Sequence, residues 1–167
     1  MAPQLNSADE RHLKRAIELS QRSLDKGGTP FGAVVVVQGQ VAGEGTSSVV
    51  ELRDPTAHAE VMALREAGSK LGRHLMEDGV MYASSEPCPM CLVACYWARL
   101  PRLVYGATST DVAISGFEDV QFYRELAEAS ERRTLITSVQ SEALRGQATE
   151  VLGAWVNQLP EPVEAKL

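Results

Sequence analysis

The sequence has few cysteines, no long apolar run and no excess of basic residues, and each shortage excludes a class of protein. Its three cysteines are an odd number, and two have the spacing Cys88-x-x-Cys91. This pattern favours metal or redox chemistry over a framework of disulfides. No run of about 18 apolar residues is present, so we expect no membrane span. Residues 1–10 are polar and lack the apolar stretch of a signal peptide, which predicts a cytoplasmic protein.

The shortage of basic residues bears on partners. The chain has 16 Lys and Arg against 22 Asp and Glu, a net charge of −6. Proteins that bind nucleic acids usually carry a basic face, so we expect no nucleic-acid partner. The 167 residues are 44% hydrophobic and 23% charged, which is typical of one globular domain. We expect this domain to span residues 1–159, followed by a flexible tail over 160–167.

The order of expected helices and strands gives the fold class. A capping box of Ser7 and Glu10 predicts the start of a helix, and a β-branched run over 32–37 with a returning strand over 40–45 predicts a hairpin. The other expected elements are helices over 57–67, 89–98, 122–129 and 142–156, and strands over 80–83, 103–105 and 135–139. This order predicts an α/β fold, a three-layer α/β/α sandwich with a mixed five-stranded sheet.

Three residues have the chemistry of a zinc site. His58 is followed, with 29 residues between, by the pair Cys88 and Cys91. One imidazole and two thiolates are suitable ligands for Zn²⁺, and three protein ligands leave a fourth position for water. A helix start at the cysteine pair favours thiolate over thiol. Zinc lowers the pKa of bound water from near 16 to roughly 7, so hydroxide becomes available at neutral pH.

Glu60 lies two residues after His58 and is the candidate catalytic residue. At this spacing its carboxylate can lie beside the metal-bound water without binding the ion. We expect it to take a proton from the water, give it to a ring nitrogen and later protonate a departing amine.

Two other interpretations of these residues stay open. The site could be structural, with Cys95 as a fourth ligand, although a buried free thiol is the favoured interpretation of that residue. The chain could also be a zinc-stabilised binding module without catalysis. However, the combination His-x-Glu with Pro-Cys-x-x-Cys is the signature of zinc nucleobase deaminases, and every fixed position of it is present. The sequence therefore favours a catalytic site.

These motifs resemble the cytidine deaminase-like superfamily, and within it the bacterial guanine deaminases. The segments 54–60 and 86–91 also resemble tRNA adenosine deaminases. Narrower similarity to the guanine deaminases lies at 30–33, 96–99, 110–111 and 116–119, and the whole resemblance runs from about residue 10 to 157.

The resemblance implies a cytidine deaminase-like fold and the hydrolysis of guanine to xanthine and ammonia. Phe31 and Trp97 would supply apolar walls for a flat purine, Asp119 would accept hydrogen bonds from its N–H groups, and Ala59 would also contact the substrate. The resemblance further implies a homodimer, in which the C-terminal segment from about residue 120 crosses to the partner.

One position departs from the family pattern. Ser47 stands where these deaminases usually have an asparagine that pairs with the base. A hydroxyl offers one donor, whereas an amide offers two donors and a carbonyl. The sequence therefore leaves open another substrate, such as an aminotriazine, a pterin or a nucleoside. A tRNA adenosine deaminase is a further alternative, but the C-terminal third is acidic and lacks the cluster of basic residues that would bind RNA phosphates.

Overall fold

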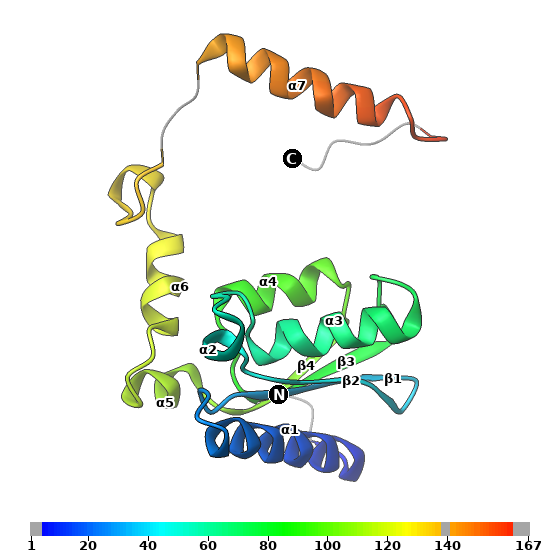
Figure 1. Ribbon diagram of the computed structural model, residues 1–167, viewed down its shortest axis with the longest axis vertical. Coiled ribbons are helices and arrows are strands. Elements are labelled where there is room, and N and C mark those ends of the chain that lie inside the picture. The colour runs from blue at the N-terminus through cyan, green and yellow to red at the C-terminus, as the bar shows by residue number, and fades with distance from the viewer. Residues whose placement is uncertain (1–4, 138–140, 162–167) are drawn as a thin grey trace. The chain divides into compact units, whose positions relative to one another are not determined.

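The computed structural model describes residues 5–137 and 141–161, which belong to two compact units (Figure 1). The first unit spans Met1–Ala127 and the second Glu128–Leu167. The second unit contains a short 3-10 helix, Ser130–Arg132, and helix α7, Glu142–Val156. Within the described ranges, no helix is both long enough and apolar enough to cross a lipid bilayer.

The first unit is built on a mixed sheet with the strand order β2-β1-β3-β4. Strand β1 is antiparallel to both of its neighbours, whereas β3 and β4 are parallel. Gln38 and Gly39 connect β1 and β2 with positive φ angles of 50° and 76°, the geometry of a tight hairpin turn. The strands are β1 (Gly32–Val37), β2 (Gln40–Thr46), β3 (Gly79–Ser85) and β4 (Arg102–Ala107).

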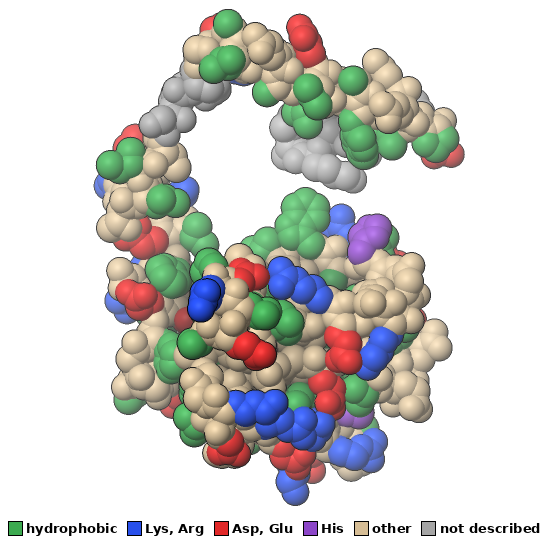
Figure 2. Space-filling model, viewed as in Figure 1, with side chains coloured by type: hydrophobic (Ala, Val, Ile, Leu, Met, Phe, Trp, Pro, Cys, Tyr) green, Lys and Arg blue, Asp and Glu red, His purple; other side chains and the backbone are tan. Residues whose placement is uncertain are grey.

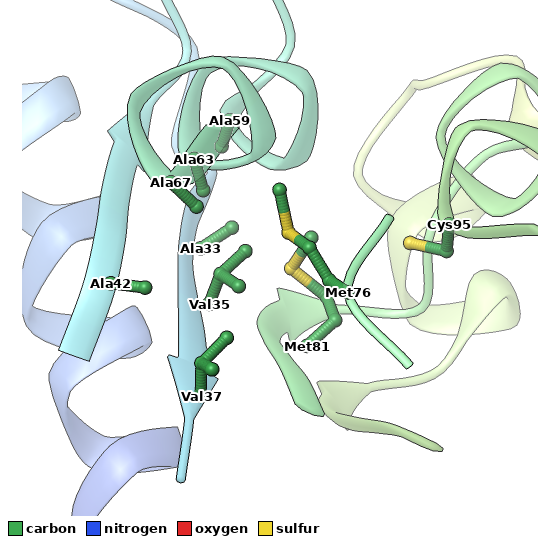
Figure 3. Packing of buried hydrophobic residues seen from close by; sticks show 10 residues of the cluster. All are labelled: Ala33, Val35, Val37, Ala42, Ala59, Ala63, Ala67, Met76, Met81 and Cys95. Atoms are coloured by element: carbon green, nitrogen blue, oxygen red, sulfur yellow. The ribbon is translucent and has the colours of Figure 1, made fainter. Parts of the chain in front are cut away.

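Helices cover both faces of this sheet, so the predicted three-layer sandwich is confirmed (Figure 1). Helix α1, Ser7–Asp25, packs on one face, and α3, Ala59–Leu71, and α4, Pro89–Trp97, lie on the other. Side chains of a strand alternate between faces, and β1 is buried on both. Figure 3 shows its odd-numbered residues in the core beneath α3; that cluster comprises Ala33, Val35, Val37, Ala42, Ala59, Ala63, Ala67, Met76, Met81 and Cys95.

Helix α3 lies unusually close to β2. A Cβ atom added to Gly45 would lie 2.6 Å from the backbone nitrogen of Ala63, and closer still to the carbonyl oxygen of Ala59. Gly43 makes the same kind of approach to Ala67. Glycine on the strand and alanine on the helix therefore allow the start of α3, with its functional residues, to lie directly on the sheet.

A buried ionic network joins α1 to the sheet on the opposite face. The carboxylate of Asp9 accepts two hydrogen bonds from the Arg102 guanidinium, at 2.7 and 2.9 Å, and one from the Tyr82 hydroxyl at 2.7 Å. The hydrogen bond from Arg102 is the main cause that holds the pKa of Asp9 well below its usual value. His12 packs on the Tyr82 ring, and burial lowers its pKa.

The predicted fifth strand is wrong: the sheet has four strands over the described residues. Residues 135–137 form no strand, and 138–139 lie outside the described ranges. Leu135 and Ile136 are 75% and 86% exposed. Strand propensity acts through packing against neighbours, and the apolar pattern of this segment does not by itself specify a neighbour.

Smaller differences concern helix starts and short helices. The capping box of α1 consists of Asn6 and Asp9, one residue earlier than predicted from Ser7 and Glu10. Asparagine and aspartate can form the same reciprocal hydrogen bonds as serine and glutamate. The sequence did not predict the two short helices α2, Val49–Leu52, and α5, Ser109–Ile114, and it placed the start of α6, Asp119–Ala127, three residues late.

Candidate active site

The predicted metal ligands converge at the starts of two helices. His58 is the N-cap of α3, Cys88 is the N-cap of α4, and Cys91 lies in the first turn of α4. The Cys88 sulfur is 3.6 Å from Nδ1 of His58, and all three ligand atoms lie within 4.8 Å of one another. Ligands of one tetrahedral zinc ion stand about 3.5–3.8 Å apart. The arrangement therefore fits one zinc ion with three protein ligands.

The electrostatics of this cluster favour a bound cation. A hydrogen bond from the Cys91 thiol, assisted by His58, lowers the pKa of Cys88. The same shared proton raises the pKa of Cys91, and the hydrogen bond with Cys88 raises the pKa of His58. A zinc ion would replace the proton that these groups share.

Cys95 is not part of the metal cluster. Its side chain is buried in the core beneath α3, and burial raises its pKa to about 12. The metal-binding group found in the described part of the chain contains only His58, Cys88 and Cys91. The interpretation of Cys95 as a buried free thiol is thus confirmed, and three ligands leave the fourth coordination position open.

Glu60 lies at the second position of α3, beside the metal ligands. Its side chain is 6% exposed, and its carboxylate interacts with Cys91 and with its own backbone N–H. Burial raises its pKa to about 7. A carboxyl group with this pKa can both accept and donate a proton near neutral pH.

A cavity of about 160 Å³ opens onto the metal cluster. The ring of Phe31 meets the ring of Phe117 edge to face, with centroids 4.8 Å apart. Asp119, at the start of α6, borders the same cavity, and burial raises its pKa. The cavity is lined by Thr29, Phe31, Ser47, Val49, His58, Glu60, Ser85, Glu86, Cys88, Phe117 and Asp119. It thus combines a metal site, a proton-transfer group and apolar rings.

The structure brings three of the five predicted substrate residues to this cavity. Phe31, Ser47 and Asp119 line it. Ala59 is fully buried in the core beneath α3 and does not line the cavity. Trp97, at the end of α4, is 74% exposed and borders a separate groove. Neither residue therefore contacts the cavity with its side chain within one chain.

Five cavity residues were not predicted as site residues, although two of them lie in the segments 86–91 and 116–119 that carry the family resemblance; the five are Thr29, Val49, Ser85, Glu86 and Phe117. Several of them flank residues that it did select: Phe117 lies two positions before Asp119, and Glu86 two before Cys88. Their closeness in the sequence to the predicted metal and substrate residues was the one signal that could have identified them as cavity residues.

Two hydrogen bonds connect residues 86 and 87, which precede the metal ligand Cys88, to the segment that carries Asp119. The Glu86 carboxylate accepts one from the backbone N–H of Ser109, at 2.7 Å. The hydroxyl of Tyr123, in α6, donates one to the carbonyl of Pro87, at 2.8 Å. These bonds fix α5 and α6 relative to the residue before Cys88, and so hold Asp119 at the cavity.

Comparison with known proteins gives a consistent result. Residues 6–107 match the model of the cytidine and deoxycytidylate deaminase zinc-binding region. The chain is 46% identical to the guanine deaminase of Bacillus subtilis over 127 residues, which are 75% of this chain and 81% of that protein. It is 38% identical to the tRNA-specific adenosine deaminase of Aquifex aeolicus over 98 residues, 59% of this chain and 65% of that one.

Solved structures agree with these relatives. The structure of a guanine deaminase from Bacillus subtilis superposes with a TM-score of 0.85 at 39% identity, covering 96% of this chain and 100% of that one. A structure in complex with 2,6-diaminopurine gives a TM-score of 0.64 at 32% identity, covering 70% of this chain and 65% of that one. The chain, with His58, Cys88 and Cys91 as its zinc-binding residues, therefore belongs to the cytidine and deoxycytidylate deaminase family.

Proposed function

We propose that the protein removes the amino group of a free purine-type base by hydrolysis, and that guanine, converted to xanthine and ammonia, is its substrate. The observation that carries this proposal is one small cavity lined by two of the zinc ligands, His58 and Cys88, together with the buried carboxyl of Glu60, the carboxylate of Asp119 and two aromatic rings. The similarity to a guanine deaminase over three quarters of the chain supports it.

The proton transfers fall to Glu60. Zinc, when bound, supplies a hydroxide at neutral pH from coordinated water. Glu60 takes the proton that this water loses and delivers it to the ring nitrogen next to the amino-bearing carbon. It then takes the second proton of the water and gives it to the amino group, which leaves as ammonia. The oxygen of the water remains on the ring as the new carbonyl, so the reaction balances.

The other cavity residues would orient the base. The edge-to-face rings of Phe31 and Phe117 offer apolar surface against which a flat heterocycle can pack. Asp119 offers a carboxylate to ring or exocyclic N–H groups, a charge-assisted hydrogen bond that is stronger than a neutral one. The relative bound to 2,6-diaminopurine, a purine with two amino groups, supports a ligand of this class.

The charge distribution supports a free base over a tRNA substrate. The net charge is −6, and Figure 2 shows Lys and Arg side chains interspersed with Asp and Glu on the visible face of the first unit. Binding an RNA loop requires several basic residues close together. Tight binding of tRNA at physiological salt would overturn this preference.

We also propose that the protein is a homodimer in which the C-terminal segment docks on the partner. Helix α7 has 15 residues, and isolated helices of this length are marginal in water. It exposes the apolar side chains Leu144, Val151, Leu152 and Trp155, which Figure 2 shows as hydrophobic patches along the helix. Sedimentation should give a dimer, and Trp155→Glu should give a monomer; a wild-type monomer would contradict the proposal.

The substrate is tested by ammonia release from a panel of bases. Zinc-loaded protein should release ammonia from guanine, and more slowly or not at all from guanosine, adenine, cytosine, pterin and aminotriazines. A Ser47→Asn variant tested on the same panel shows whether this position sets the preference. Fastest release from a pterin or an aminotriazine would replace guanine as the substrate, whereas no release from any member would refute the function.

A further inference from the structure

We propose that Thr29 and Ser47 act together as a hydroxyl pair that donates one hydrogen bond to an acceptor atom of the base, and so determine substrate specificity. This inference rests on the proposed function. It says what position 47 contributes to substrate binding when its side chain is the hydroxyl of serine and not the amide of asparagine. Thr29 is thereby a specificity residue, although it lies 18 positions from Ser47 and outside every motif.

The two side chains are in direct contact at the cavity. The Thr29 hydroxyl donates to the Ser47 hydroxyl over 2.5 Å, a short hydrogen bond. Both residues line the cavity that contains the metal ligand His58 and the carboxylate of Asp119. Ser47 is buried, with 8% of its surface exposed. The pair is thus placed to touch a base that reaches the metal site.

The backbone around the pair is fixed. The N–H of Ser47 donates to the carbonyl of Phe31 at 3.0 Å, and its carbonyl accepts from the Ser23 hydroxyl at 3.2 Å. A Cβ atom on Gly28 would lie 2.7 Å from that same Ser23 oxygen, so a larger residue before Thr29 would displace the Ser23 hydroxyl. Neither side chain therefore needs to be ordered when a ligand binds, which reduces the entropic cost of binding.

The number of protons explains what the pair offers. Two hydroxyls have two protons, and the mutual hydrogen bond uses one of them. Neither hydroxyl donates to any other atom of residues 5–137 or 141–161. One proton is therefore left for a ligand, whichever of the two hydroxyls donates to the other. Buried donors without a partner are rarer in proteins than acceptors with a spare lone pair, so a donating role toward the ligand is favoured.

This proton defines the chemistry of the ligand. The base must present an acceptor, a carbonyl oxygen or an unprotonated ring nitrogen, toward Thr29 and Ser47. It must also present N–H groups toward Asp119, whose ionised carboxylate only accepts. An oxo-amino purine such as guanine has both kinds of edge. A base without the acceptor would leave the last proton of the pair buried and unpaired, at a cost in affinity of about tenfold.

The test is a double-mutant cycle with conservative controls. Thr29→Val has the shape of threonine without the hydroxyl, Thr29→Ser keeps the hydroxyl, and Ser47→Ala removes the second member of the pair. For the panel member that the wild type deaminates fastest, Thr29→Val and Ser47→Ala should each raise KM about tenfold with little change in kcat, because the hydroxyl that remains keeps its proton but is no longer oriented by a hydrogen bond with its neighbour. Thr29→Ser should retain the wild-type KM. The rise in KM of the double variant should be much smaller than the product of the rises in the two single variants.

Two purine analogues locate the acceptor. In 7-deazaguanine a C–H group replaces one ring-nitrogen acceptor, and 2-aminopurine lacks the 6-oxo group. Wild type should bind one of them about tenfold more weakly than guanine, and the double variant should lose this discrimination. Suppose that guanine is deaminated, but that the rise in KM of the double variant equals the product of the two single rises, or that Thr29→Val has the wild-type KM. The proposed role of the hydroxyl pair is then refuted, and the proposed function stands. If no member of the panel is deaminated, both fall.

Discussion

Gly45→Ala is expected to damage the active site from a position that touches no substrate. Gly45 lies in β2 beneath the start of α3, and an added Cβ atom would lie 2.6 Å from the backbone nitrogen of Ala63. Carbon atoms in favourable contact stand about 3.5–4.0 Å apart. The start of α3 must therefore move away from the sheet by about 1 Å. The clashing atoms belong to its backbone, which cannot relieve the clash by a change of rotamer as a side chain can.

This displacement has two measurable consequences. Overpacking of this kind costs about 1–3 kcal/mol of unfolding free energy. His58 and Glu60 lie at the start of α3 and move with it, whereas Cys88 and Cys91 lie on α4 and do not. Since a misplacement of about 1 Å can cost about 100-fold in rate, we expect a comparable loss of kcat together with weaker zinc binding.

The assay compares Gly45→Ala with Gly68→Ala, a matched change within α3. A Cβ atom on Gly68 would meet nothing closer than the Arg73 carbonyl oxygen at 3.4 Å, an ordinary contact. Alanine is favoured over glycine in a helix by about 0.5–1 kcal/mol, so this control should keep or gain stability. Urea denaturation, zinc content and ammonia release are measured for both. Wild-type stability and rate in Gly45→Ala would refute the account of how the sheet positions the metal site.

Three further predictions test the ionic network, the link to α6 and the metal. Because the folded-state pKa of Asp9 lies below its unfolded value, the carboxylate stabilises the fold fully above about pH 5 and progressively less as the pH falls below about 4. Asp9→Asn should therefore lower the free energy of unfolding by about 2–4 kcal/mol at pH 7, and this deficit should be about 1 kcal/mol smaller at pH 3 and continue to shrink at lower pH; a deficit independent of pH would contradict this. Tyr123→Phe removes the hydrogen bond to Pro87 and should lower kcat/KM about five- to tenfold at unchanged zinc content, whereas wild-type kinetics would show that this link does not position Asp119. Removal of zinc with a chelator should lower Tm and abolish turnover, and added zinc should restore both; an unchanged Tm would argue against a metal held by the folded state alone.

The metal site could be predicted from sequence because few residue types bind zinc and their spacing reflects local structure. His58 and Cys88 each cap a helix that directly carries the next functional residue, Glu60 or Cys91. Residues that lie this close in the sequence also lie close together in the structure, whatever the rest of the fold is. The hairpin and the longer helices of the first unit were predicted for the same reason, because each depends on local periodicity and turn residues, whereas the short helices α2 and α5 were not.

The substrate pocket could be predicted only in part, because its walls come from distant segments. Trp97 has the residue type of a purine wall, yet it points to solvent in one chain, whereas Phe117 forms the wall with Phe31. Thr29 acquires its role only through its contact with Ser47. The strand predicted over 135–139, which residues 135–137 do not form, has the same cause, because strand formation requires a neighbour that a local pattern does not specify.

The central claim, that Glu60 moves the protons of a zinc-dependent deamination, is tested most directly by comparing wild type with Glu60→Gln. Both proteins are loaded with zinc, their metal content is measured, and ammonia and xanthine release from guanine is followed. Glutamine has nearly the same shape but cannot accept a proton. The account predicts full zinc content and a rate at least about 10²–10⁴-fold lower in the variant. A Glu60→Gln protein that releases ammonia at the wild-type rate would contradict it.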